Sequence, residues 1–185
     1  MKKTQYFANY FKTIYQNLES IESVHLEQAA AMVWATHKAG KKLILAGNGG
    51  SAAMASHVAV DFTKAASIRA INFNEADLIT CFSNDYGYEH WVAKAIEFYG
   101  EKGDLLILIS SSGNSKNMIN AARTSKRLGI DLVTFTGFSQ YNFLKQEGIL
   151  NFWVDSRAYN IVENTHQIWL LMVCDLIVGK AEYSA

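Results

Sequence analysis

Hydrophobic residues in the first forty positions recur at the spacing of amphipathic helices. Tyr6, Tyr10 and Ile14 are four residues apart and predict a first helix that continues to about Ile21. A second helix is predicted from Ser23 to His37. No strand precedes these helices, so their apolar stripes must pack on the later part of the chain or on another copy of it.

From Lys41 onward, short apolar runs alternate with helical patterns. The strongest run, Asp104-Leu-Leu-Ile-Leu-Ile-Ser110, is apolar at nearly every position. Such runs are typical of strands that are buried on both faces of a parallel sheet. The expected strands are 42–47, 68–73, 104–110, 130–136 and 151–154, and the expected helices are 51–64, 88–99, 115–128, 141–146 and 159–180.

This alternation predicts an α/β fold, a doubly wound sandwich around a parallel sheet of about five strands with right-handed crossovers. We expect residues 1–185 to form a single domain, in which 1–40 are a helical pair and 41–185 the α/β core. The last helix is apolar on nearly all sides from Ile168 to Cys174, which predicts that it is buried. That run is far shorter than the ~20 residues of a membrane span.

Two loops rich in small residues follow strands and open helices. They are Gly47-Asn-Gly-Gly-Ser51 and Ser110-Ser-Ser-Gly-Asn-Ser115. Free backbone N–H groups and the positive end of a helix dipole stabilise a dianion, and serine hydroxyls add short donors. A serine at a helix start is also an ordinary N-cap. Two such loops at equivalent places in one sheet favour the phosphate interpretation over capping alone.

The first loop also fits a dinucleotide-binding pattern, Gly47-x-Gly49-x-x-Ala52. That pattern requires an acidic residue at the end of the second strand to hold a ribose hydroxyl. Asn72 and Asn74 stand there instead. We therefore expect no nucleotide cofactor.

Composition narrows the range of partners. The chain is 50% hydrophobic, which suffices for a core, and its 17 basic and 17 acidic residues give a net charge of +0. A neutral chain lacks the basic surplus of a nonspecific nucleic-acid binder. Two cysteines are too few for a disulfide scaffold, and polar residues interrupt the N-terminal apolar stretch. We expect a soluble cytoplasmic protein without membrane or direct nucleic-acid contacts.

Three segments together resemble the SIS (sugar isomerase) domain, and most closely its phosphoheptose isomerase branch. They are the GNGGSAA run from Gly47 with His57 beyond it, Ser83–Glu89, and Ile109–Asn117. The resemblance implies a flavodoxin-like three-layer sandwich, assembled as a homotetramer with active sites at subunit interfaces. It also implies a sugar phosphate substrate of the sedoheptulose 7-phosphate class. The binding residues that it implies are Asn48, Gly49, Ser51, Asp85, Ser110, Ser111, Ser112 and Ser115.

The catalytic pattern of that branch is altered here. Four residues after His57 the branch has a glutamate base, whereas this chain has Asp61. On the last helix Glu163 stands in place of a glutamine and Leu171 in place of a histidine, while His166 matches another histidine of the pattern. Our hypothesis is that Asp61 is the base and that His166 or Glu163 is its acid partner. A zinc or other divalent ion held by His57, Asp61 and Glu163 is a further hypothesis.

The resulting functional prediction is a phosphosugar aldose–ketose isomerase of the sedoheptulose 7-phosphate type that acts through an enediolate. The alternative is a non-catalytic phosphosugar-binding SIS protein with a regulatory or partner-binding role. Loss of the branch's catalytic histidine with both phosphate loops retained is the pattern that such a sensor would show.

Overall fold

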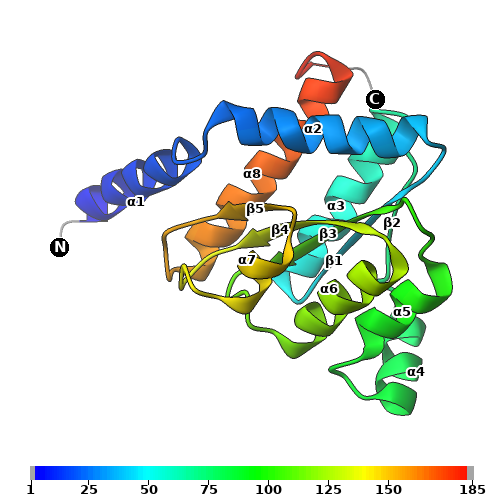
Figure 1. The fold of residues 1–185 in the computed structure, drawn as a ribbon. Helices are drawn as coiled ribbons and strands as arrows, with labels where there is room; N and C mark the ends of the chain where they lie inside the picture. Colours follow the sequence, from blue (N-terminus) through cyan, green and yellow to red (C-terminus); the bar gives the residue numbers. More distant parts are fainter. Residues whose placement is uncertain (1–2, 183–185) are drawn as a thin grey trace.

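The computed structural model describes residues 3–182 and has the predicted α/β architecture (Figure 1). Five parallel strands form one sheet in the order β2-β1-β3-β4-β5. The strands are β1 (Leu43–Gly47), β2 (Ala70–Asn72), β3 (Leu105–Ser110), β4 (Asp131–Thr136) and β5 (Leu150–Trp153). The helices are α1 (Lys3–Leu18), α2 (Ser23–Lys38), α3 (Gly50–Lys64), α4 (Ala76–Tyr86), α5 (Trp91–Tyr99), α6 (Lys116–Leu128), α7 (Phe143–Glu147) and α8 (Tyr159–Val178).

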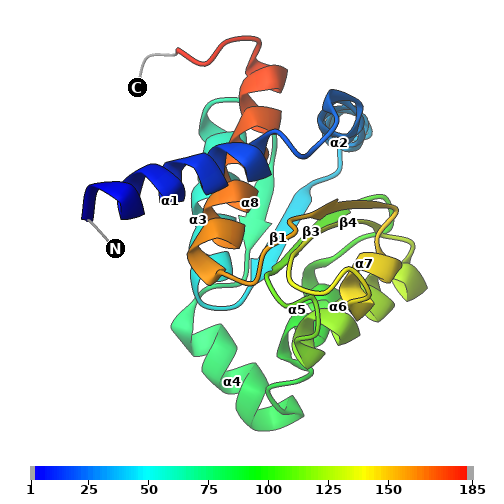
Figure 2. The same cartoon turned by 90° about the vertical axis from the view of Figure 1, so that its left-hand side faces the viewer.

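Both faces of the sheet are covered by helices, because successive side chains of a strand point to opposite sides. Leu43 and Leu105 pack into one core cluster with α2, α3 and α8. Ile44 and Leu106, one position further along, pack into a second cluster with α5, α6 and α7. Figures 1 and 2 show these helical layers on opposite sides of the strands. The strands are therefore continuously apolar because both faces of the sheet are buried, as predicted.

Helix α8 is the central element of the first cluster, and its burial is less complete than the sequence suggested. Trp169 and Cys174 are buried, whereas Ile168 is 37% exposed and Met172 46% exposed. The prediction of burial on nearly all sides was therefore wrong for the outer stripe of the helix in one chain. Within residues 3–182, α8 is also the helix that is long and apolar enough to cross a membrane by length and composition. Its packing in the sandwich is that of a core helix.

Helix α1 extends away from the sandwich, and none of its residues is buried (Figures 1 and 2). Its C-terminal end is held where the indole N–H of Trp169 donates to the carbonyl of Leu18, at 3.1 Å. Large side chains along the helix are exposed, namely Tyr6, Phe7, Phe11 and Tyr15. The apolar stripe predicted from the sequence is thus present and is not covered within one chain.

Helix α4 was not predicted. It follows β2, which has only three residues, and it packs on the second cluster through Leu78, Ile79 and Phe82. These three contact residues form too short a periodic pattern to indicate a helix in the sequence alone. As a consequence Asp85, which the resemblance implied as a binding residue, lies on α4.

Candidate functional site

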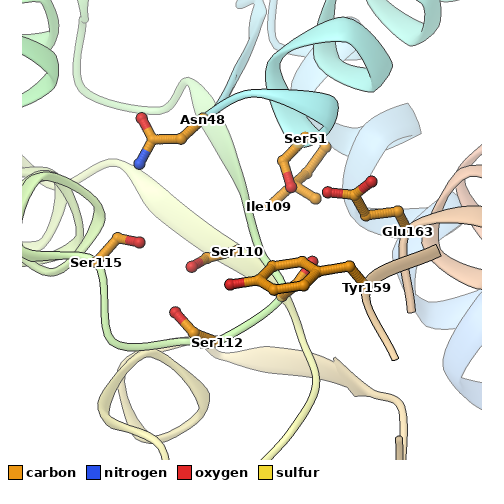
Figure 3. A pocket seen from close by; sticks show the side chains of 9 residues that line it. Asn48, Ser51, Ile109, Ser110, Ser112, Ser115, Tyr159 and Glu163 are labelled. Atoms are coloured by element: carbon orange, nitrogen blue, oxygen red, sulfur yellow. The ribbon is translucent and has the colours of Figure 1, made fainter. Parts of the chain in front are cut away.

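The register of the sheet brings the two small-residue loops together. Gly47, the last residue of β1, pairs with Ile109 near the end of β3, so both loops leave the same edge of neighbouring strands. They line one cavity of about 140 Å³. Its lining residues are Asn48, Ser51, Ile109, Ser110, Ser111, Ser112, Ser115, Tyr159 and Glu163 (Figure 3).

The floor of this cavity is a serine-rich turn at the start of α6. Ser115 is the N-cap residue of that helix, and Ser111 is only 4% exposed. The hydroxyl of Ser111 has no hydrogen-bond partner among residues 3–182, although a buried polar group normally has one. Gly113 has a φ of 64°, and a Cβ there would collide with the amide of Asn142, so the turn requires glycine. Helix dipole, free N–H groups and hydroxyls together suit an anion.

Glu163 is the carboxylate that lines the cavity, and it comes from α8. A Cβ at Gly50 would lie 2.5 Å from Glu163 Oε2, so the carboxylate rests directly on the start of α3. Burial raises the pKa of the Glu163 carboxyl above its ordinary value. Within the described residues, the Glu163 carboxylate makes no hydrogen bond or ion pair. Figure 3 shows Glu163 and Tyr159 on the side opposite Asn48 and Ser115. A carboxylate with a raised pKa, facing an anion site, can exchange a proton with a bound ligand.

His166 does not reach the cavity. It is fully buried, and its Nε2 donates to the carbonyl of Thr136 at 2.9 Å. Burial lowers the pKa of His166 from 6.5 to about 4, because the hydrogen bond to Thr136 offsets only part of the cost of charging the ring. The expectation that His166 is an acid partner therefore finds no geometric support; within one chain it is a neutral core residue.

This buried histidine predicts a loss of stability in acid. Below pH 6.5 the unfolded chain binds a proton at His166, whereas the folded chain does so only near pH 4. The free energy of unfolding should therefore fall by about 3 kcal/mol between these two pH values. Urea unfolding of the wild type and of His166→Gln at pH 7, 5.5 and 4.5 measures this. Equal pH dependence in both proteins would contradict the assignment.

His57 and Asp61 form a separate pair on α3 and do not line the cavity. His57 Nε2 is 3.3 Å from Asp61 Oδ2, and His57 Nδ1 is 3.0 Å from Gln167 Nε2. Both ring nitrogens thus face protein groups. His57 also lies seven residues beyond Gly50 on α3, a rise of ~10 Å along the helix. The Glu163 carboxylate contacts Gly50, so His57 lies about one such length away from it. The expected base Asp61 is therefore remote from the serine turn in this chain.

The hypothesised metal ligands do not come together within the described residues of one chain. Among residues 3–182, no three His, Cys, Asp or Glu side chains are placed to hold a metal ion. His57 and Asp61 engage each other, whereas Glu163, on α8, lies beside the N-terminus of α3, and Leu171 supplies no ligand. Burial and the Asp61 charge raise the pKa of the Cys174 thiol to about 12.

Two expected ligand contacts lie outside the cavity. Asp85 is exposed on α4, where its carboxylate accepts a hydrogen bond from Asn84 Nδ2 at 2.9 Å. Gly49 is the N-cap of α3 and shapes the first loop without lining the cavity. Asn48, Ser51 and the four serines of the second loop do line it, as expected from the sequence.

Sequence reasoning missed Tyr159, Tyr88 and Asn117. Tyr159 begins α8 and lines the cavity beside Glu163. Tyr88 and Asn117 both bind the side chain of Asn48. The available signal was position alone: Tyr159 follows the carboxyl end of the last strand, where ligands of such sheets bind. Tyr88 and Asn117 stand in segments that carry the family resemblance, but their contacts with Asn48 join distant parts of the sequence and are visible only in the fold.

Comparisons with known proteins agree with this geometry. A sequence model of the SIS domain matches residues 5–137. The phosphoheptose isomerase of Akkermansia muciniphila is 31% identical, with 94% of this chain and 96% of that protein covered. The phosphoheptose isomerase of Fusobacterium nucleatum subsp. nucleatum is 37% identical, with coverage of 89% and 84%.

Solved structures give the same result. Phosphoheptose isomerase GmhA from Neisseria gonorrhoeae superposes with a TM-score of 0.86 at 27% identity, covering 96% of this chain and 99% of that one. Nearly the whole chain thus has the fold of that solved structure.

Proposed function

Because this chain belongs to the SIS domain family and, within it, to the phosphoheptose isomerases, we propose that it interconverts sedoheptulose 7-phosphate and an aldoheptose 7-phosphate. The observation that carries this proposal is the single cavity in which an anion-binding serine turn faces the carboxylate of Glu163. An isomerase of this kind needs an anchor for the phosphate and a base at the other end of the sugar chain.

The phosphate binds at the start of α6. Backbone N–H groups and the hydroxyls of Ser110, Ser111, Ser112 and Ser115 donate to its oxygens, and the helix dipole favours its charge. The sugar chain extends from there toward Ser51 and Glu163. Anchoring one end holds C1 and C2 near the carboxylate, so that the proton transfer occurs within a bound complex.

Glu163 acts as the acid–base group of the reaction. It removes the proton from the carbon that carries a hydroxyl next to the carbonyl, which gives an enediolate. A proton then moves from that hydroxyl oxygen to the former carbonyl oxygen, and Glu163 returns the carbon-bound proton to the neighbouring carbon. The N-terminus of α3, which carries Ser51 and which the Glu163 side chain contacts, directs the positive end of its dipole toward the negative oxygen of the enediolate. This assignment gives Glu163 the role that we first expected for Asp61, since Asp61 is paired with His57 away from the cavity.

Isotope exchange tests the proposal. The protein is incubated with sedoheptulose 7-phosphate in heavy water, and deuterium is sought at C1 and C2 while the aldose is quantified. Incorporation with turnover supports an isomerase. Binding of several ketose phosphates with no label would contradict it and would favour the non-catalytic, regulatory alternative.

The contact between Gly50 and Glu163 yields a second prediction. A methyl group at position 50 occupies the place of the carboxylate, so Gly50→Ala should displace Glu163. We expect kcat/KM to fall about 30-fold, because misplacing a reacting group by about 1 Å is costly. The midpoint of thermal unfolding should change little, since the flexible side chain of Glu163 can move aside and alanine has a higher helix propensity than glycine. Steady-state kinetics with calorimetry would show this, with the exposed Ala53→Ser as the matched control. Full activity of Gly50→Ala would contradict the placement of Glu163.

The assembly and location follow from the same family assignment. We propose a homo-oligomer, and specifically a tetramer, in which the exposed aromatic residues of α1 and the outer stripe of α8 are covered by other subunits. We also propose a cytoplasmic location, where sugar phosphates are found. Sedimentation equilibrium tests the assembly state, and a monomer at micromolar concentration would contradict it.

A further inference from the structure

The buried side-chain amide of Asn117 connects helix α6 to the loop between β1 and α3. Asn117 lies in the first turn of α6 and is only 2% exposed. Its Oδ1 accepts from Asn48 Nδ2 at 3.0 Å, and its Nδ2 donates to Asn48 Oδ1 at 2.8 Å. Asn48 belongs to the loop between β1 and α3, so this reciprocal pair fixes that loop to the helix that carries the serine turn.

A third group completes the hydrogen bonding of Asn48. The hydroxyl of Tyr88 donates to Asn48 Oδ1 at 3.2 Å. A side-chain carbonyl has two acceptor positions and an amide nitrogen has two hydrogens. Both acceptor positions of Asn48 are therefore used within the protein, as is one of its hydrogens. What Asn48 has left for a ligand is one N–H donor. Figure 3 shows Nδ2 of Asn48 turned toward the side of the cavity where Ser115 lies, with Oδ1 turned away.

We propose that Asn117, assisted by Tyr88, is a positioning residue that holds Asn48 as a hydrogen-bond donor toward the negatively charged oxygens of the ligand. This inference rests on the proposed function, which supplies the phosphate and the enediolate as acceptors. The opposite orientation of the amide would place the Asn48 carbonyl against those oxygens and repel them. Asn117 thus selects anionic ligands without touching them.

Two variants of Asn117 separate this role from simple space filling. Asp has the shape of Asn but only accepts, so Asn117→Asp should draw the NH₂ group of Asn48 toward itself and turn the carbonyl into the cavity. Asn117→Ala removes the constraint without reversing it. Calorimetric affinity for sedoheptulose 7-phosphate should fall about 100-fold in Asn117→Asp and about tenfold in Asn117→Ala. A residue that only fills space predicts the reverse order, and that result would overturn the inference.

The charge of the new carboxylate needs its own control. Asn120→Asp adds the same charge one turn further along α6, where the Asn120 amide donates to the carbonyl of Glu89 at 2.8 Å. Its affinity should stay within threefold of wild type. In an Asn48→Ala background, Asn117→Asp should cost less than threefold further, since its effect passes through Asn48. A further loss as large as in the wild-type background would show plain charge repulsion and refute the positioning role.

Folding failure and failure of the proposed function give different results. Tyr88 is exposed, so Tyr88→Phe should fold normally and still weaken binding about threefold; unchanged affinity would count against the inference. Because the readout is affinity, a wild type that binds the sugar phosphate without turnover would refute the isomerase and leave the order of the variants intact. A wild type that binds no sugar phosphate would refute both.

Discussion

Replacing Glu163 with glutamine is expected to lower kcat for sedoheptulose 7-phosphate about a thousandfold, with KM changed by less than a factor of three. Glutamine has the same shape but cannot accept the carbon-bound proton, and a positioned acid–base group contributes on the order of 10²–10⁴ in rate. Glu163 is the carboxylate that lines the cavity, and burial raises its pKa above the ordinary value. Deuterium incorporation at C1 and C2 should disappear in parallel.

The matched control for this prediction is Asp61→Asn. It makes the same carboxylate-to-amide change on a residue that faces His57 and does not line the cavity of its own chain. We expect it to retain at least a third of the wild-type kcat. If Asp61→Asn lost activity as completely as Glu163→Gln, the base would be Asp61, reaching a site built across two subunits. If Glu163→Gln stayed within threefold of wild type, the role of Glu163 would be refuted.

Removing two hydroxyls of the serine turn should have the second-largest effect. The double variant Ser112→Ala, Ser115→Ala is expected to weaken sedoheptulose 7-phosphate binding at least about 100-fold, since each hydrogen bond to a charged group contributes about 1.5–3 kcal/mol. The two residues are less buried than Ser110 and Ser111, so the fold should tolerate the change. Calorimetric titration measures the affinity.

Comparing sedoheptulose 7-phosphate with sedoheptulose tests whether the serine turn binds the phosphate group of the ligand. Affinity for sedoheptulose without phosphate should be the same in the double variant and the wild type. Ser139→Ala, in the loop after β4, changes a serine that does not line this cavity and should leave both affinities unchanged. Equal weakening of the phosphorylated and the plain sugar would mean that the turn does not hold the phosphate.

Much of the fold could be predicted because its signals are local. The apolar runs at 104–110 and 130–136 identified buried parallel strands, and the structure confirms them as β3 and β4. The serine turn and the first loop could be located for the same reason, since each follows such a strand and opens a helix. Helix α4 could not be located, because only Leu78, Ile79 and Phe82 contact the core and the rest of its surface is polar or exposed.

The candidate for the acid–base group could be chosen only from the tertiary structure. The family resemblance offered Asp61, Glu163 and His166 as acid–base candidates, and their environments differ only in the folded chain. His166 is directed into the core, where it bonds Thr136, and Asp61 is occupied by His57. Glu163 is directed toward Gly50 and the cavity. Positions three apart on one helix, such as 163 and 166, differ by about 60° in direction, which is enough to separate cavity from core.

By itself, the amino-acid sequence determined that this protein is a parallel α/β sandwich with two small-residue turns at the ends of its strands, because periodicity, glycine and serine act through neighbouring residues. Only the tertiary structure decided which charged side chain faces those turns, and that Asn117 and Tyr88 hold Asn48 in place. Those arrangements depend on contacts between residues 40 to 113 positions apart, such as Tyr88 with Asn48 and Glu163 with Gly50. Such contacts exist only once the sheet has set the directions of the helices that carry them.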